Sequence, residues 1–186
     1  MLLFQSECMK QYLTPIKIGT LDDVRLWSHI VFEEIDEKWK LHQCTWLEYI
    51  IQIWNIVVVD NHDRVLEFWP KWLPVIHIDQ HTDMRPVEDW VNVGNFLHHA
   101  LDTNHISGST QINTEYSLLN FTAPKHPYIL DIDLDFRDPA MGIESFDKSI
   151  QICKWLIQNA QIITIATSPY FIDQTLALRL LQKLLT

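Results

Sequence analysis

The segment Asp79–Asp83, with the sequence DQHTD, constrains this chain more than any other feature of its sequence. It follows the hydrophobic run Pro74–Ile78, and a run of this length without polar alternation is typical of a strand buried on both faces. Extended backbone places every second side chain on the same side, so Asp79, His81 and Asp83 face one way. Because a buried carboxylate is costly unless it is paired or bound to a metal, this cluster predicts a cation site.

A second acidic segment, Asp131–Asp138, holds four aspartates within eight residues. Three of them alternate along a strand that is otherwise apolar. Together the two segments offer more carboxylates than one zinc ion binds, and several aspartates with few histidines suit Mn²⁺ better than structural zinc. Either segment alone is also explained by solvated turn residues, by caps, or by a Mg²⁺ or Ca²⁺ site.

The charge balance narrows the classes of partner. The chain has 14 basic and 24 acidic residues and a net charge of -10, which argues against nucleic acid and against an anionic membrane surface. It suits cations, either metal ions or substrates with ammonium or guanidinium groups, although plain solubility explains it equally well. We expect a cytoplasmic protein, because there is no signal-peptide pattern, no apolar run of about 18 residues and no disulfide pattern among three separated cysteines. A homo-oligomer is left open.

Hydrophobic runs that alternate with helical patterns predict a single α/β domain over residues 1–186, with a mostly parallel central sheet flanked by helices. The expected strands are Ile50–Val59, Val65–Trp69 as its hairpin partner, Pro74–Ile78, Tyr128–Asp135 and Ile162–Ala166. The expected helices begin at Asp22 or Asp23, at Ser145, and at Asp173, the last continuing to Leu185. Ligands of such folds collect at the carboxyl ends of the strands, where His62 and both acidic segments lie.

The two acidic segments resemble motifs of the arginase/deacetylase superfamily. Asp79–Asp83 is similar to its Asp-x-His-x-Asp motif, and Asp133–Pro139 is similar to its Asp-x-Asp-x-x-Asp-Pro motif, in the same order. The wider phrases 75–81, 130–136 and 163–169 resemble the peptide arginase branch, which converts arginine side chains of ribosomally made peptides to ornithine. The resemblance implies a three-layer arginase-like fold with its motif-bearing core at about 56–172, and an arginine-containing precursor peptide as partner.

Carried over position by position, the resemblance implies two Mn²⁺ ions per chain. The implied ligands are Asp79 and Asp133 as bridges, Asp83 on the first ion, and His81 and Asp135 on the second. His62 is the nearest match to a further family histidine, but the glycines that precede that histidine in the family are missing here, and a surface loop position also explains it.

Two neighbouring residues are ambiguous. A register shifted by two would make Asp131 a ligand in place of Asp135, whereas the ending Asp138-Pro139 favours the later register, with Asp131 as an acceptor behind the ligands. His77 alternates with Asp79, and we interpret it as a supporting or core residue.

The resemblance also implies a mechanism, in which a hydroxide that bridges two Mn²⁺ ions attacks the guanidinium carbon. Asp83 would pass a proton to the departing nitrogen. His98 lies in the interval where arginases carry a histidine proton shuttle, although His98 and His99 are equally well explained as a helix surface pair. Asp173 is the candidate to bind the guanidinium group, with Glu144 as the second choice.

Three other functions remain as alternatives to a peptide arginase. A small-molecule ureohydrolase of the arginase or agmatinase kind and a metal-dependent deacetylase would share the fold and the metal chemistry. A metal-binding or peptide-binding module without catalysis would share the fold alone. Release of urea, and from which substrate, discriminates among them.

Overall fold

The computed structural model describes residues 18–26, 32–35, 41–87, 89–137 and 146–186. Seven strands form the central sheet, in the order β1-β4-β5-β9-β8-β6-β7. The strands are β1 (Ile18–Gly19), β4 (Ile50–Ile53), β5 (Ile56–Val59), β6 (Pro74–Ile78), β7 (Gly108–Ile112), β8 (Ile129–Asp133) and β9 (Ile162–Ala166). The five strands from β5 to β7 run parallel, whereas β4 pairs antiparallel with β5. A separate antiparallel pair consists of β2 (Phe32–Ile35) and β3 (Leu41–Cys44).

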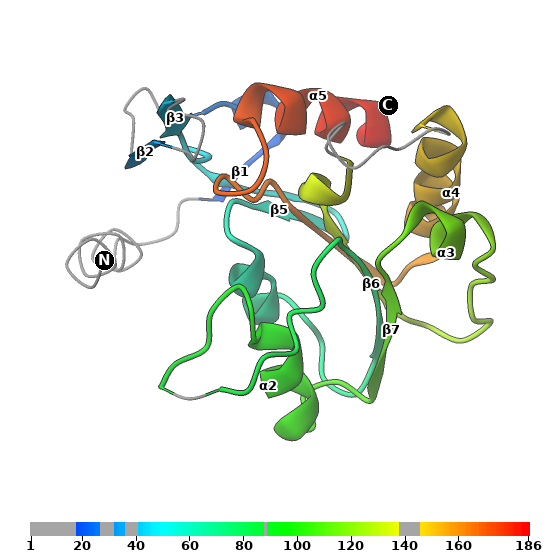
Figure 1. Cartoon of the computed structure of the whole chain (residues 1–186). Coiled ribbons are helices and arrows are strands. Elements are labelled where there is room, and N and C mark those ends of the chain that lie inside the picture. Colours follow the sequence, from blue (N-terminus) through cyan, green and yellow to red (C-terminus); the bar gives the residue numbers. More distant parts are fainter. Residues whose placement is uncertain (1–17, 27–31, 36–40, 88, 138–145) are drawn as a thin grey trace.

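Helices cover both faces of the sheet, which gives the three-layer α/β fold that the sequence predicts (Figure 1). One face, which we call the α2 face, is covered by α2 (Phe96–Asp102) and the 3-10 helix η2 (His62–Glu67). The opposite face is covered by α3 (Glu115–Leu119), α4 (Phe146–Asn159) and α5 (Gln174–Leu185). Two further 3-10 helices are η1 (Leu21–Asp23) and η3 (Leu134–Arg137). Within the described ranges, no helix has the length and apolar character needed to cross a membrane.

The parallel strands are buried on both faces, as their continuous hydrophobic runs predict. Alternate residues of β8 pack into different halves of the core. Leu130 and Ile132 join the cluster under α4 and α5, while Ile129 joins the cluster under α2. All five residues of β8 are buried, although two of them are aspartates.

The strand register places three polar residues side by side within the α2 face. His77 of β6 is paired with Asp131 of β8, and Asp131 is paired with Thr164 of β9. None of the three side chains is exposed to solvent. A polar row in the middle of a sheet requires internal hydrogen bonds to offset the lost contact with water. The next side chains toward the carboxyl ends on the same face are Asp79 and Asp133.

Four expected elements differ from the structure. The expected strand Ile50–Val59 is a hairpin of β4 and β5 with a turn at residues 54–55. The expected strand Tyr128–Asp135 ends at Asp133, and η3 follows it.

Residues 62–67 form η2 in place of the start of the expected strand Val65–Trp69, because the backbone bonds to itself three residues apart, with the Phe68 amide donating to the Val65 carbonyl. The helix expected from Asp22 or Asp23 is absent from the described residues 18–26: η1 ends at Asp23, and Leu26 lies in an isolated bridge to Leu47.

The predicted cap Ser145, together with Glu144 and the Asp138-Pro139 ending, lies outside the described residues.

The buried strand residues should dominate the stability of the fold. Leu130 is fully buried, so Leu130→Ala should lower the free energy of unfolding by about 2–5 kcal/mol. The matched control Leu21→Ala removes a leucine that is 50% exposed and should change it by less than about 0.5 kcal/mol. Urea denaturation of both variants checks this, and equal effects would contradict the assignment of the core.

Candidate metal centre

Three strands of the parallel part of the sheet, β5, β6 and β8, deliver acidic and imidazole groups to one edge of the sheet. Asp79 follows the last residue of β6, Asp133 ends β8, and His62 begins η2 just beyond β5. All three side chains are buried. The carboxyl ends of parallel strands meet at the same edge, which is why segments so far apart in the sequence come together here.

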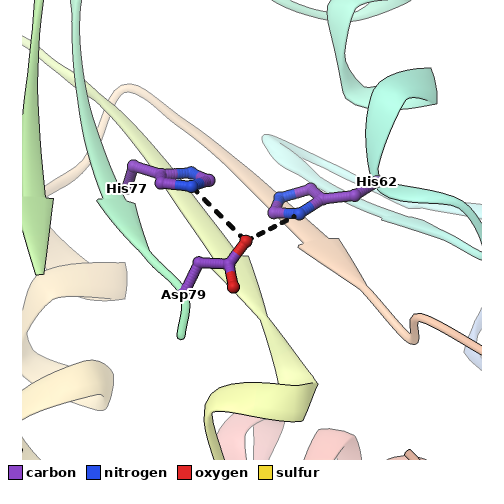
Figure 2. Close-up of side chains that lie close together, drawn as sticks. All are labelled: His62, His77 and Asp79. Atoms are coloured by element: carbon purple, nitrogen blue, oxygen red, sulfur yellow. Dashed lines mark ion pairs between the residues drawn. The ribbon is translucent and has the colours of Figure 1, made fainter. Parts of the chain in front are cut away.

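The first group of donors centres on Asp79 Oδ2 (Figure 2). His62 Nδ1 lies 3.2 Å from this oxygen and His77 Nε2 lies 3.4 Å from it. Two further carboxylate oxygens face His62 Nδ1, Asp133 Oδ2 at 3.1 Å and Asp83 Oδ2 at 3.4 Å. Metal–ligand bonds of about 2.0–2.2 Å place neighbouring ligands about 2.8–3.6 Å apart, so these spacings suit a single ion.

The second group lies on the other side of Asp79. His81 Nδ1 is 3.4 Å from Asp79 Oδ1 and 3.1 Å from Asp135 Oδ2. Asp79 thus directs one oxygen at each group, which is the position that a bridging ligand occupies. Asp133 lies close to both as well, because its Oδ2 faces His62 while its Oδ1 accepts a hydrogen bond from the amide of Asp135. The roles of the individual ligands stay predictions.

Several of these atoms are buried but lack hydrogen-bond partners among the described residues. They are His62 Nδ1, His77 Nε2, Asp79 Oδ2, Asp83 Oδ2 and both carboxylate oxygens of Asp135. A buried polar atom without a partner costs free energy, so a cluster of them that faces two common points fits bound cations. The donor set therefore fits two metal ions, with mainly oxygen donors and a few imidazoles.

Asp131 orients the histidines of the first group. Its Oδ2 lies 2.8 Å from His62 Nε2 and 2.9 Å from His77 Nδ1, and its Oδ1 accepts a hydrogen bond of 2.6 Å from the Thr164 hydroxyl. Burial raises the pKa of Asp131, but His62 and His77 outweigh that effect and lower it to about 2. An ionised carboxylate only accepts, so the proton of each imidazole faces Asp131 and the other nitrogen faces the metal group.

Contacts from neighbouring strands hold the loop after β6. The side-chain amide of Asn113 donates to the carbonyls of Asp79 and His81 at 2.9 and 2.8 Å, and Gln111 donates to the carbonyl of Thr82 at 2.8 Å. Asp83 has a φ of 50°, a left-handed conformation that is uncommon outside glycine and concentrates at functional sites. The loop is therefore shaped to direct the Asp83 carboxylate inward.

Without a bound metal, the carboxylates of the centre have too little positive charge around them for all of them to ionise. Burial, followed by the charges of Asp133 and Asp79, raises the pKa of Asp135 to about 8. Burial, together with the charge of Asp79, raises the pKa of Asp83 to about 7 even though His62 and His77 oppose the shift. Like charges this close cannot all ionise without a cation.

When no metal is bound, protonated imidazoles supply part of the positive charge that the carboxylates lack. Contact with Asp79 is the main reason that the pKa of His81 rises to about 9. Burial lowers the pKa of His77, but Asp131 and Asp79 outweigh it and raise the pKa to about 9. Burial raises the pKa of Asp79, but contacts with His62, His77 and His81 outweigh it and hold the pKa below its usual value. Metal ions must displace these protons in order to bind.

A pocket of about 240 Å³ opens over the two groups. It is lined by His62, His81, Thr82, Asp83, Arg85, Asn92, Val93, Gly94, Asp133 and Phe171. Phe171, which is 46% exposed, lies against the His81 ring, with 5.0 Å between the ring centroids. The mouth of the pocket is thus partly aromatic.

Neither candidate for an accessory catalytic role lines this pocket. His98 lies on α2, with Nε2 3.6 Å from Asp102 one turn further along the helix. Asp173 is the N-cap of α5, where its Oδ1 accepts a hydrogen bond of 2.9 Å from the amide of Leu176. The structure gives Asp173 a capping role, and its contact with a guanidinium group stays a prediction. An N-cap residue lies directly before the first helical residue and turns its side chain to the amides of the first turn, which fixes where its carboxylate lies.

Two residues of the centre have roles that the sequence reasoning did not assign to them. His77 faces the metal group directly, and its alternation with Asp79 was the available signal. Ser168, with a left-handed φ of 46°, donates a hydrogen bond of 2.5 Å to Asp133 Oδ2. Its position just beyond the end of β9 was the only hint.

No protein-family model and no curated protein sequence matches the chain. Among solved structures, it is similar to proclavaminate amidino hydrolase from Streptomyces clavuligerus, with a TM-score of 0.54 and 15% identity over 70% of this chain and 62% of that one. It is also similar to a hypothetical agmatinase from Burkholderia thailandensis, with a TM-score of 0.53 and 18% identity over 74% of this chain and 58% of that one. The match spans about three fifths of each of these proteins, and it establishes a common arginase-like fold.

The stability of the metal-free protein should fall between pH 5 and pH 9. Asp83 and Asp135 have raised pKa values, so the folded state binds more protons than the unfolded state above about pH 4, and this advantage is lost as the pH rises through about 7 and 8. The contributions of His77 and His81 are lost in the same direction, as the pH rises through about 9. Because 1 kcal/mol moves Tm by roughly 2–4 °C at this size, we expect a decrease of several degrees.

Scanning calorimetry with and without added Mn²⁺ measures this effect. Metal should raise Tm most at the alkaline end. If the Tm of the metal-free protein rose steadily from pH 5 to pH 9, the raised pKa values of Asp83 and Asp135 would be contradicted.

Replacing the buried acceptor should weaken the centre without removing any predicted ligand. In Asp131→Asn the amide oxygen can still accept from both imidazoles, while the amide nitrogen faces the Thr164 oxygen, so the shape is kept and the charge is lost. Loss of such a supporting charge typically lowers metal affinity about 10–100-fold. Calorimetric titration with Mn²⁺ checks this. Asp147→Asn removes the same charge from an exposed site and serves as the control. An unchanged affinity in Asp131→Asn would refute the role of Asp131.

Proposed function

We propose that the chain is a metal-dependent hydrolase, a peptide arginase, that converts arginine residues of a ribosomally synthesised peptide to ornithine and releases urea. The observation that carries this proposal is the pair of donor groups that share Asp79, within a fold common to an amidino hydrolase and an agmatinase. The proposed cofactor is two Mn²⁺ ions, which suit a donor set with more carboxylates than imidazoles.

The reaction adds water to the guanidinium group. Oxygen bonds to the guanidinium carbon, the bond from that carbon to the side-chain nitrogen breaks, and the products are urea and a protonated ornithine amine. The bound ions would supply an activated water at neutral pH. His62, His81 and the aspartates of the two groups would hold those ions.

Two aspartates and the surrounding charge serve the chemistry more directly. Asp83 lines the pocket, where its carboxyl group would pass a proton to the leaving nitrogen. Asp133 also lines the pocket and accepts a hydrogen bond from Ser168, which fixes its orientation. The net charge of -10 favours the approach of a cationic substrate.

The shape of the pocket favours a side chain that projects from a larger molecule. Its volume of about 240 Å³ lies below the range of about 300–1,000 Å³ typical of sites for drug-sized ligands, so a peptide could place only one side chain inside it. Phe171 lines the pocket, and both it and its neighbour in sequence, Tyr170, are exposed and offer apolar surface to a peptide.

A small-molecule ureohydrolase is the second candidate. It is favoured by the two structural neighbours, whose names describe an amidino hydrolase and an agmatinase. A deacetylase would share the fold and the metal chemistry but would release acetate.

The decisive assay measures urea from Mn²⁺-loaded protein given arginine-containing peptides, free arginine or agmatine in separate reactions. We expect urea from peptides only. Asp133→Ala should lower turnover by at least about 10³-fold, because it removes a ligand near both donor groups, while circular dichroism stays close to that of the wild type.

The matched control Asp147→Ala removes an exposed aspartate at the start of α4 and should leave urea release unchanged. Urea from free arginine or agmatine alone would favour the second candidate. Wild-type rates in Asp133→Ala would refute the proposed centre.

A further inference from the structure

His77 lies inside the first donor group, although the resemblance assigns it no metal. The ligand set implied by the resemblance includes His62, whose ring lies in the first donor group, but it does not include His77. In the structure the rings of His62 and His77 stack with 5.3 Å between their centroids and 20° between their planes. Both rings direct a nitrogen toward the same oxygen of Asp79 (Figure 2).

The geometry of His77 is that of a ligand rather than of a core histidine. Its side chain is fully buried, and its Nδ1 contacts Asp131 at 2.9 Å. Its Nε2 has no hydrogen-bond partner among the described residues, and it lies 3.4 Å from Asp79 Oδ2 and 3.7 Å from Asp83 Oδ2. A core histidine normally satisfies both nitrogens. A metal-bound histidine instead donates one N–H to a carboxylate and presents the other nitrogen to the ion.

Packing holds the His77 ring in this orientation. Phe96 of α2 contacts both rings, with centroids 4.7 Å from His62 and 6.0 Å from His77. Thr164 donates to the second oxygen of Asp131 and itself accepts a hydrogen bond of 3.1 Å from the indole of Trp69. A ring fixed from behind in this way has little freedom to turn its Nε2 away from the group.

We propose that His77 Nε2 is a ligand of the first metal ion, alongside His62 Nδ1, so that two imidazoles hold this ion and one imidazole holds the second. The inference rests on the proposed function only in requiring that the centre binds metal. It makes the two positions chemically unequal. The first has a larger nitrogen share and should favour Co²⁺ or Zn²⁺ over Mn²⁺ more strongly than the second, whose remaining donors are carboxylates.

The test counts coordinated imidazoles directly on the full chain loaded with Co²⁺. Each neutral imidazole bound to Co²⁺ keeps one N–H, whose proton NMR signal is shifted far outside the normal range and disappears in D₂O. The N–H groups of His62 and His77 are buried against Asp131, so they should exchange slowly, whereas the His81 side chain is 45% exposed and should exchange fast. We expect two slowly exchanging shifted signals in the wild type.

The variant His77→Gln should remove one of these two signals and lower the affinity for Mn²⁺ by more than about tenfold. The control His105→Gln replaces a half-buried histidine whose Nε2 contacts the carbonyl of Trp69 at 2.9 Å, and it should keep both signals and the affinity. The wild-type count needs no variant, so it holds even if His77→Gln fails to fold.

One slowly exchanging signal in the wild type, or two in a folded His77→Gln, would overturn the assignment of His77. Failure of the proposed function gives a different result. Two signals with no urea from any substrate would refute the hydrolase while leaving His77 as a ligand. Urea release with a single slowly exchanging signal would do the reverse.

Discussion

The centre depends on one buried carboxylate that two imidazoles share. Asp131 has no solvent contact, yet it accepts from His62, His77 and Thr164. Ionised and fully bonded, it sets which nitrogen of each ring carries a proton and thereby turns the free nitrogen of each ring toward Asp79. The interaction exists because the strand register aligns His77, Asp131 and Thr164 in adjacent strands. A shift of one residue in β8 would turn Asp131 toward the opposite face.

The raised pKa values in the site arise because several carboxylates lie close together at the carboxyl ends of the parallel strands. Asp83 and Asp135 keep their protons to unusually high pH, which means that the fold has arranged more carboxylates than it can ionise alone. Backbone in uncommon conformations at Asp83 and Ser168 brings further oxygen atoms to this place. The free-energy cost of uncommon backbone and crowded carboxylates is tolerated where a bound ligand offsets it. The metal-free protein therefore has the properties expected of a site that binds cations.

The fold and the chemistry are supported at different levels. The chain shares a three-layer fold with the proclavaminate amidino hydrolase and the hypothetical agmatinase at only 15% and 18% sequence identity. Such a fold requires only that hydrophobic strands alternate along the chain with amphipathic helices. Function resides in the side chains placed on that scaffold. Here these include the two donor groups and a polar row, His77, Asp131 and Thr164, that connects the first donor group to the interior of the sheet.

The sequence by itself determined the α/β class, the parallel strands Pro74–Ile78 and Ile162–Ala166, and the two acidic segments, because continuous hydrophobic runs and alternating acids are local patterns. It predicted the helix that begins at Asp173, but it could not show that Val65–Trp69 begins within a 3-10 helix, because that depends on which neighbours the segment packs against. Only the tertiary structure decided that His77 faces the donor group and that Asp131 lies behind it. Those positions follow from the pairing of β6, β8 and β9, a long-range relation that no single segment encodes.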